Sequence, residues 1–285
     1  MNIKKGLTRL LLVGFLIGFS FEEALGQAKA FGTELPVGVE SQAIIKLMTP
    51  DIDPSLVTLV GMKKWPHRPN TYLAIVCAAR SRADFSNDSL YAGGVPCCNA
   101  GYGGVQESET PKLVYLSMLE YTDDLKLIAS YPGMLDVKTC WKHSNMEAPN
   151  YESEDFLNPG SYDRFDFAKY KISDDQIAFG IRVGWRNMYA GGGGYFQALM
   201  LFMVQGSTIV NVLSEPISEE GMSSGEWNAD GTRSKNIWET NNIVIMLPSK
   251  TSGFYDIKMK ELKGKWSQRF KWHAGDRRYK AVQAN

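Results

Sequence analysis

Histidine is scarce in this chain, and the His and Cys spacings that mark common metal sites are missing. Only His67, His143 and His273 occur, and no two of them have the spacing of metal ligands. The chain also has no CxxC pair. We therefore predict no metal and no cofactor, and the sequence favours a binding protein over an enzyme.

A net charge and long apolar runs are missing as well. The chain has 31 basic and 31 acidic residues and a formal net charge of zero, so nothing electrostatic favours nucleic acid as a partner. The apolar run at residues 10–19 is shorter than the roughly 20 residues of a membrane-spanning helix. We expect neither a nucleic-acid partner nor an integral membrane span in the processed chain.

The first thirty residues have the organisation of a secretory signal peptide. Three basic residues precede the apolar run and small residues follow it, and cleavage after Gly26 or after Ala30 fits the pattern. The first cysteine is Cys77, so no cysteine is present near either cleavage point for lipid attachment. The sequence predicts a signal peptide at residues 1–30 and a periplasmic or secreted location in a bacterium.

Four cysteines in an exported chain are expected to form disulfides. They are Cys77, Cys97, Cys98 and Cys140. A bond between the adjacent Cys97 and Cys98 would be strained, so Cys77 and Cys140 are each expected to bond one member of that pair. Each bridge would stabilise the fold by roughly 3 kcal/mol. Which cysteine bonds which member of the pair is left open.

Short segments that alternate apolar and polar residues recur from about residue 56 to the C-terminus, bounded by Gly, Pro, Asp and Asn. The predicted strands are 55–62, 71–79, 112–121, 125–130, 176–185, 198–204, 208–213, 243–247, 254–260, 266–273 and 278–282. Segment 266–273 is predicted to be half-buried, and the best helix candidate is 39–48. The fold is therefore expected to be mainly β, with little helix. Repeated antiparallel meanders of three to four strands would form an irregular β-propeller or a β-sandwich.

Two β units are predicted after the signal peptide. An N-terminal unit with the disulfides covers 31–145, a polar loop or linker covers 146–163, and a C-terminal unit covers 164–285. The tetrapeptide Tyr-Ala-Gly-Gly at 91–94 recurs at 189–192 within a similar order of strands, which indicates an internal repeat. The polar segment 219–236 is predicted to be a surface loop with a turn at Asp230-Gly231.

The glycine-rich stretch 191–194 is the candidate binding site. No helix N-terminus with Lys and Ser or Thr follows it, which argues against a phosphate loop. We expect instead a flexible loop whose aromatic rim contacts a protein or carbohydrate, with packing of these aromatics beneath the loop as the alternative. The predicted binding residues are Trp185, Arg186, Tyr189, Gly191, Gly192, Gly193, Gly194 and Tyr195.

Two segments resemble exported, β-rich bacterial proteins of uncharacterised function. In 182–213, the 189–194 stretch lies between predicted strands and Leu201-Phe202 precedes a turn at Gly206. The second segment is the closing hairpin at 255–279. The resemblance implies a soluble periplasmic or secreted β protein and brings no catalytic residues. Some such proteins accompany toxins or wall hydrolases as inhibitors, which is an analogy at the level of fold.

Together these observations predict a periplasmic or secreted protein-binding protein of immunity or inhibitor type. It would dock a toxin or wall hydrolase through its glycine- and aromatic-rich loops. One alternative is a secreted hydrolase that acts on carbohydrate or peptidoglycan with dispersed carboxylates. A second alternative is an envelope structural protein. The identity of the partner and the oligomeric state are left open.

Overall fold

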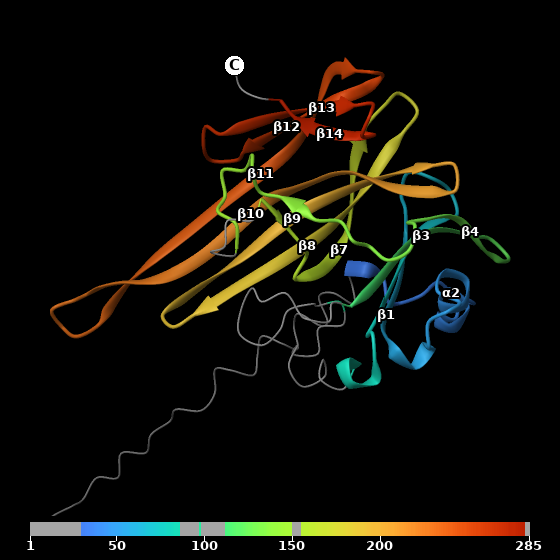
Figure 1. Cartoon of the computed structure of the whole chain (residues 1–285), viewed down its shortest axis with the longest axis horizontal. Coiled ribbons are helices and arrows are strands. Elements are labelled where there is room, and N and C mark those ends of the chain that lie inside the picture. The colour runs from blue at the N-terminus through green and yellow to red at the C-terminus, as the bar shows by residue number, and fades with distance from the viewer. Residues whose placement is uncertain (1–29, 86–96, 98–111, 150–154, 283–285) are drawn as a thin grey trace, which may run out of the picture.

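The computed structural model describes residues 30–85, 97, 112–149 and 155–282 of the chain (Figure 1). Strands dominate these residues. The elements, in chain order, are α2 (Ser41–Met48), η1 (Pro54–Leu56), β1 (Val57–Lys64), β2 (Thr71–Ala78), β3 (Leu113–Tyr121), β4 (Leu125–Ser130), β5 (Thr139–Cys140), β6 (Phe156–Leu157), β7 (Ser161–Lys171), β8 (Ile177–Tyr189), β9 (Gly192–Gln205), β10 (Thr208–Trp227), β11 (Arg233–Thr251), β12 (Phe254–Glu261), β13 (Ser267–His273) and β14 (Arg278–Ala281).

A 12-stranded sheet contains two antiparallel meanders. The first runs from β1 to β4, and the second runs from β7 to β14. They join where Ser130 of β4 pairs in parallel with Thr208 of β10. Strands β5 and β6 form a separate two-stranded sheet.

The second meander folds over because β11 changes partners along its length. Its first half pairs with β10 up to Asn241, and its second half pairs with β12 from Asn242 onward. Strands β12–β14 therefore lie over one face of β8–β10, while β1–β4 lie against the other face (Figure 1). The result is three stacked layers, of which β7–β10 is the central one.

The sequence of β9 explains why this layer is central. Its even-numbered residues from 198 to 202 lie in the core shared with the first layer. Its odd-numbered residues from 199 to 203 lie in the core shared with β12–β14. Because side chains alternate between the faces of a strand, a strand buried on both faces needs a continuous apolar run. Residues 198–203, Ala-Leu-Met-Leu-Phe-Met, supply that run.

Strand β2 has the same double burial in the first layer. Leu73 and Ile75 face the core shared with β7–β10, whereas Ala74 and Val76 face α2. Ile44 of α2 is fully buried against them. Helix α2 therefore covers the outer face of the first layer, within the segment where a helix was expected.

The mainly β fold with antiparallel meanders is confirmed. The described strands stack face to face, which is the sandwich-like arrangement of the two that the sequence allowed. Segment 125–130 forms β4 with the expected bounds. Strand β13 is half-buried as predicted, since Phe270 and Trp272 are buried while the residues between and beside them are exposed.

Strand β7 was not predicted, because its ladder with β8 is irregular. The register shifts between Tyr162 and Arg164 and again between Asp166 and Tyr170. Tyr162, Phe165 and Tyr170 are buried, so the buried positions are three and five residues apart. This spacing hides the two-residue period that identifies a strand.

The prediction of a surface loop at 219–236 was wrong. Most of this segment belongs to β10 and β11, and only the short connection between those strands is a turn. The turn itself is confirmed. The N–H of Gly231 donates to the Asn228 carbonyl at 3.0 Å, and Gly231 has a φ of +81°. Asp230 accepts the N–H of Thr232 at 2.9 Å, as in an Asx-turn.

The division into units at 31–145, 146–163 and 164–285 stays a prediction. The main core draws residues from both predicted units, and the predicted linker contains β6 and the start of β7. The first copy of the repeat, 91–94, and nearly all of the signal peptide lie outside the described residues. Within the described part of the chain, no helix is long and apolar enough to cross a membrane.

Candidate docking surface on a projecting arm

Four strands continue beyond the stacked layers as a long ribbon, which we call the arm (lower left in Figure 1). The arm comprises 185–189 of β8, 192–197 of β9, 218–227 of β10 and 233–241 of β11. Two hairpin turns close its outer end. The predicted binding residues all lie on or beside the first of these hairpins, between β8 and β9.

One row of residues crosses the arm and leaves large apolar side chains in solvent. Met188 pairs with Gly193, Gly193 with Met222, and Met222 with Ile237. Residues paired directly across a sheet share one face. The exposed fractions of the three large side chains are 62% for Met188, 39% for Met222 and 76% for Ile237. We call these four residues the arm row.

Trp227 adds a further exposed apolar side chain at the end of β10. It is 69% exposed, and the Arg233 guanidinium lies 5.2 Å from the centre of its ring. Most large apolar side chains of the described residues are buried. The concentration of exposed ones on the arm is therefore a distinctive feature of its surface.

The glycines of the arm leave room for large neighbouring side chains, and most of them do not form a flexible loop. A Cβ at Gly193 would lie 2.6 Å from Met188 Sδ and 2.7 Å from the Asn187 carbonyl oxygen. The prediction of a loop at 191–194 was wrong for three of its four residues, because Gly192–Gly194 belong to β9. Only Ala190 and Gly191 form the turn, and Gly191 has a φ of +93°, which favours glycine.

The opposite face of the arm's base is crossed by segment 141–149, which we call the strap. At β11, Asn242 Nδ2 donates to Asn145 Oδ1 at 2.9 Å. At β8, Asn187 Nδ2 donates to the Pro149 carbonyl at 3.0 Å. Between them, the ring of Trp141 packs edge-to-face against aromatic rings of β8 and β9. The strap therefore occupies this face, while the face with the arm row stays open.

The structure separates the predicted binding residues into buried and exposed ones. Trp185 is 3% exposed, and its Nε1–H donates to the Asn158 carbonyl at 2.6 Å, so it belongs to the core. Tyr195 is half-buried. Arg186 and Tyr189 are exposed, and the Arg186 guanidinium lies 5.9 Å from the centre of the Tyr195 ring. Of the aromatic side chains predicted to form the rim, Tyr189 is the most exposed.

Tyr195 takes part in a polar cluster around Asp163 at the base of the arm. The Asp163 carboxylate accepts hydrogen bonds from Ser161 Oγ at 2.7 Å, Tyr195 OH at 2.7 Å and Gln197 Nε2 at 3.2 Å. Burial raises the pKa of Asp163, although these donors act in the opposite direction. A Cβ at Gly184 would lie 2.8 Å from the Tyr195 hydroxyl oxygen. Gly184 thus leaves room for a cluster that links β7 to β9 across β8.

Glu215 is a second buried carboxyl, and it was not among the predicted site residues. It is 8% exposed in the middle of β10, and burial raises its pKa to about 8, with Arg278 acting against this shift. Burial, and next the charge of Glu215, raise the pKa of the Cys140 thiol to about 11. The thiol is therefore protonated at neutral pH and is a poor nucleophile. The signal in the sequence was an acidic residue, Glu215, close behind the apolar segment predicted as a strand at 208–213.

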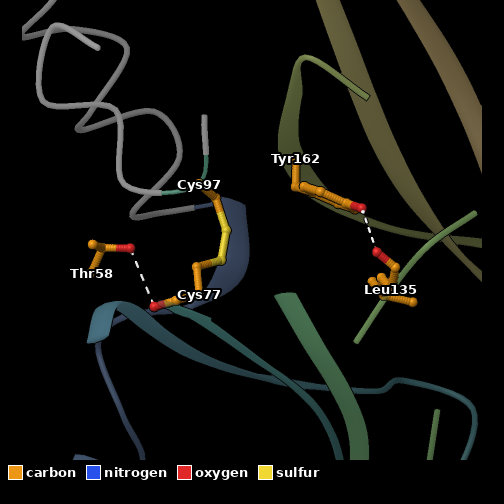
Figure 2. Close-up of a disulfide and its surroundings, with 5 residues drawn as sticks. All are labelled: Thr58, Cys77, Cys97, Leu135 and Tyr162. Atoms are coloured by element: carbon orange, nitrogen blue, oxygen red, sulfur yellow. Dashed lines mark hydrogen bonds between the residues drawn. A yellow bond between two sulfur atoms is a disulfide. The ribbon is translucent and has the colours of Figure 1, made fainter. Parts of the chain in front are cut away.

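The disulfide links Cys77 of β2 to Cys97, which confirms one bridge of the predicted set (Figure 2). The Cys97 carbonyl accepts the N–H of Tyr162 at 3.0 Å, and the Cys77 carbonyl accepts the Thr58 hydroxyl at 3.2 Å. The Tyr162 hydroxyl donates to the Leu135 carbonyl at 3.4 Å (Figure 2). The bridge therefore ties the first layer to the start of β7.

The expected bond of Cys140 to the other member of the cysteine pair is not formed. Cys140 is a free, buried thiol in β5. Its neighbour Thr139 places a hydroxyl 3.0 Å from the Ser214 hydroxyl of β10, so this strand packs onto β10. The Cys140 side chain is enclosed there instead of forming a disulfide. Cys98 lies outside the described residues.

The exposed apolar residues of the arm were missed as functional candidates. Met222, Trp227 and Ile237 are scattered among polar residues, and composition alone assigns such a stretch to a loop.

Among the described residues, no group of three His, Cys, Asp or Glu side chains could hold a metal ion.

No family model, no curated protein and no solved structure matches this chain. The resemblance to exported bacterial proteins therefore stays an expectation from the sequence.

Proposed function

We propose that this chain is an exported protein that binds another protein through the open face of its arm. The observation that carries the proposal is the arm row, in which Met188, Met222 and Ile237 are exposed side by side on one face. Methionine side chains are flexible and polarisable, so they adapt to the shape of a partner. Tryptophan, at Trp227, is among the residues that contribute most to binding at protein interfaces.

The projecting shape of the arm favours a partner with a concave surface. A ribbon of paired strands can enter a cleft that a flat surface cannot reach, and the substrate clefts of enzymes are concave. A toxin or a cell-wall hydrolase presents such a cleft. This supports the immunity or inhibitor type of binding protein, with the arm as the inhibitory element.

Export is supported by two independent features. The basic, apolar and small-residue segments of the first thirty residues form the pattern of a signal peptide. The Cys77–Cys97 bridge is of a kind that persists in oxidising compartments such as the periplasm. These features support a periplasmic or secreted location as part of the proposal, where wall hydrolases and secreted toxins act.

The test compares the double variant Met188→Ser/Met222→Ser with the wild-type protein and with Val37→Ser. Val37 is 98% exposed in a part of the chain that does not belong to the arm, so it controls for loss of any exposed apolar side chain. Each protein is immobilised, incubated with bacterial envelope extract, and the retained wall-hydrolase activity is read on a cell-wall zymogram.

We expect the wild type and Val37→Ser to retain and inhibit a hydrolase, and the double variant to lose most of that retention. Circular dichroism establishes that all three proteins are folded. Equal retention by the double variant would remove the arm row from the binding surface. Clearing of the zymogram by the purified protein alone would instead support the hydrolase alternative.

A further inference from the structure

The outer edge of β11 in the arm has no strand beside it in the described structure. Residues 233–241 pair with β10 on one side, and pairing with β12 on the other side begins only at Asn242. An unpaired edge exposes N–H and C=O groups that can bind another strand.

Two hydrogen bonds establish which backbone groups face outward from β11. Leu262 N–H, beyond β12, donates to the Asn241 carbonyl at 2.7 Å, so the groups of Asn241 point away from β10. Ser224 N–H of β10 donates to Gly191, away from β11, and Ser224 pairs with Lys235. The groups of Lys235 therefore also point outward. Since backbone direction alternates along a strand, Ile237 and Glu239 present theirs outward as well.

The charged side chains along this edge are complementary to those along the same edge of a second copy of the chain. When two copies are placed antiparallel about a two-fold axis through Ile237, Lys235 of each copy lies opposite Glu239 of the other. Ile237 then lies opposite Ile237. Centring the axis on Lys235 or on Glu239 would instead place like charges directly opposite each other, which is destabilising.

The charge distribution within one copy favours the same arrangement. Glu239 pairs directly with Glu220 of β10, so two acidic side chains are neighbours on one face. The Lys263 Nζ atom lies 3.9 Å from Glu239 Oε2, which is a long distance for an ion pair. Lys235 is exposed and forms no ion pair with any described residue. In the paired arrangement, Lys235 of the second copy lies beside Glu239 and offsets the repulsion from Glu220.

We infer that the chain forms a symmetric dimer by antiparallel pairing of β11 with β11 across residues 235–239. The two arms then make one continuous eight-stranded sheet, since each arm contributes four strands. The arm rows of the two copies join across Ile237 into one apolar stripe. This inference rests on the edge of β11 and not on the proposed function, which rests on the open face of the arm.

The test uses charge variants of the full processed chain and measures self-association by sedimentation velocity over a range of concentrations. Lys235→Glu gives an edge with two acidic residues, and Glu239→Lys gives an edge with two basic residues. We expect the dissociation constant of the dimer to be at least about tenfold higher for each variant alone than for the wild type, because opposite charges become like charges. An equimolar mixture of the two variants should form dimers at wild-type strength.

The exchanged double variant Lys235→Glu/Glu239→Lys restores the complementary pairs and should also dimerise like the wild type. Three results would overturn the inference: a wild type that stays monomeric at every concentration, a dimer that is indifferent to these charges, or dimers in the single variants alone. The variant Met188→Ser/Met222→Ser should keep the dimer. Loss of partner binding in that variant with the dimer intact separates the two proposals.

Discussion

The same strands behave in opposite ways in the core and in the arm. Residues 198–203 of β9 are buried on both faces, whereas 192–194 of the same strand are three glycines in a ribbon with one open face. In the core, β9 is held by apolar burial from two sides. In the arm, it is held by ladder hydrogen bonds and by side chains that lie across the glycines. A strand can therefore continue where its core ends, provided that its neighbours continue too.

The largest effect is expected in the core. Phe202 is fully buried, stacks on Phe179 with ring centres 5.8 Å apart, and meets the edge of Tyr131 at 6.2 Å. Phe202→Ala should lower the free energy of unfolding by about 3–5 kcal/mol, through lost burial and a cavity. Urea unfolding monitored by tryptophan fluorescence measures this. A loss below about 1 kcal/mol would mean that the core closes over the gap.

The disulfide is expected to matter to the core layers and not to the arm. Replacing both cysteines, Cys77→Ala/Cys97→Ala, opens a loop with a sequence separation of 20 residues and should cost roughly 3 kcal/mol of stability. Cys140→Ala is the matched control, since Cys140 forms no bridge. Thermal unfolding of both variants, with and without reductant, measures the difference. Reductant should destabilise Cys140→Ala, which keeps the bridge, and should leave Cys77→Ala/Cys97→Ala unchanged. A loss of stability in Cys140→Ala without reductant as large as that of the double variant would show that Cys140 is bridged after all.

Glu215 lies in β10 between core and arm, and its burial should make stability depend on pH. The folded state keeps a proton with a pKa of about 8, whereas the unfolded carboxyl releases it near 4.5. The folded state thus binds more protons between these values, and stability falls as pH rises through that window. Glu215→Gln should raise the free energy of unfolding at pH 7 by about 2–3 kcal/mol.

At pH 4 the same variant should have nearly the stability of the wild type, because the Glu215 carboxyl is then mostly protonated in both the folded and the unfolded state. Urea midpoints from pH 4 to pH 8 give the comparison. A constant difference across that range would mean that Glu215 is not neutral in the folded protein. It would then point to an ion pair with Arg278 as the main influence on the carboxyl.

The smallest effect is expected in the arm. Met222→Ala removes an exposed side chain of the arm row and should change the free energy of unfolding by no more than about 0.5 kcal/mol. Leu201→Ala, in the doubly buried part of the central sheet, is the matched comparison and should cost about 2–5 kcal/mol. Amide hydrogen exchange should likewise be faster in 218–227 than in 198–203. Equal protection would show that the arm has a core of its own.

The core could be predicted from sequence, and the arm could not, for one physical reason. A strand such as β13 alternates because one of its faces meets the core, and that alternation is visible in Phe270 and Trp272. The arm segments of β10 and β11 have no core to match, so their residues follow no simple period. Polar composition then suggested a loop. The predicted site shifted accordingly, from the rim of a loop to one face of a ribbon.

The cysteines and carboxyls show a different limit of sequence reasoning. Spacing made a bridge between Cys77 and the 97–98 pair plausible, and that bridge is present. The same spacing could not show that Cys140 packs against β10 beside Glu215. Such neighbours come from strands far apart in the chain, so only the folded arrangement reveals them.

The length of β10 has a mechanical consequence. Its 20 residues, about 65 Å at the usual rise of a strand, run without a break from the contact with β4 to the end of the arm. The strand therefore acts as a lever, with its support in the stacked layers and its free end at Trp227. A force on the arm directed along β10 loads its ladder with β9 in shear, and the pairs of that ladder, from Thr208 to Ser223, share the load.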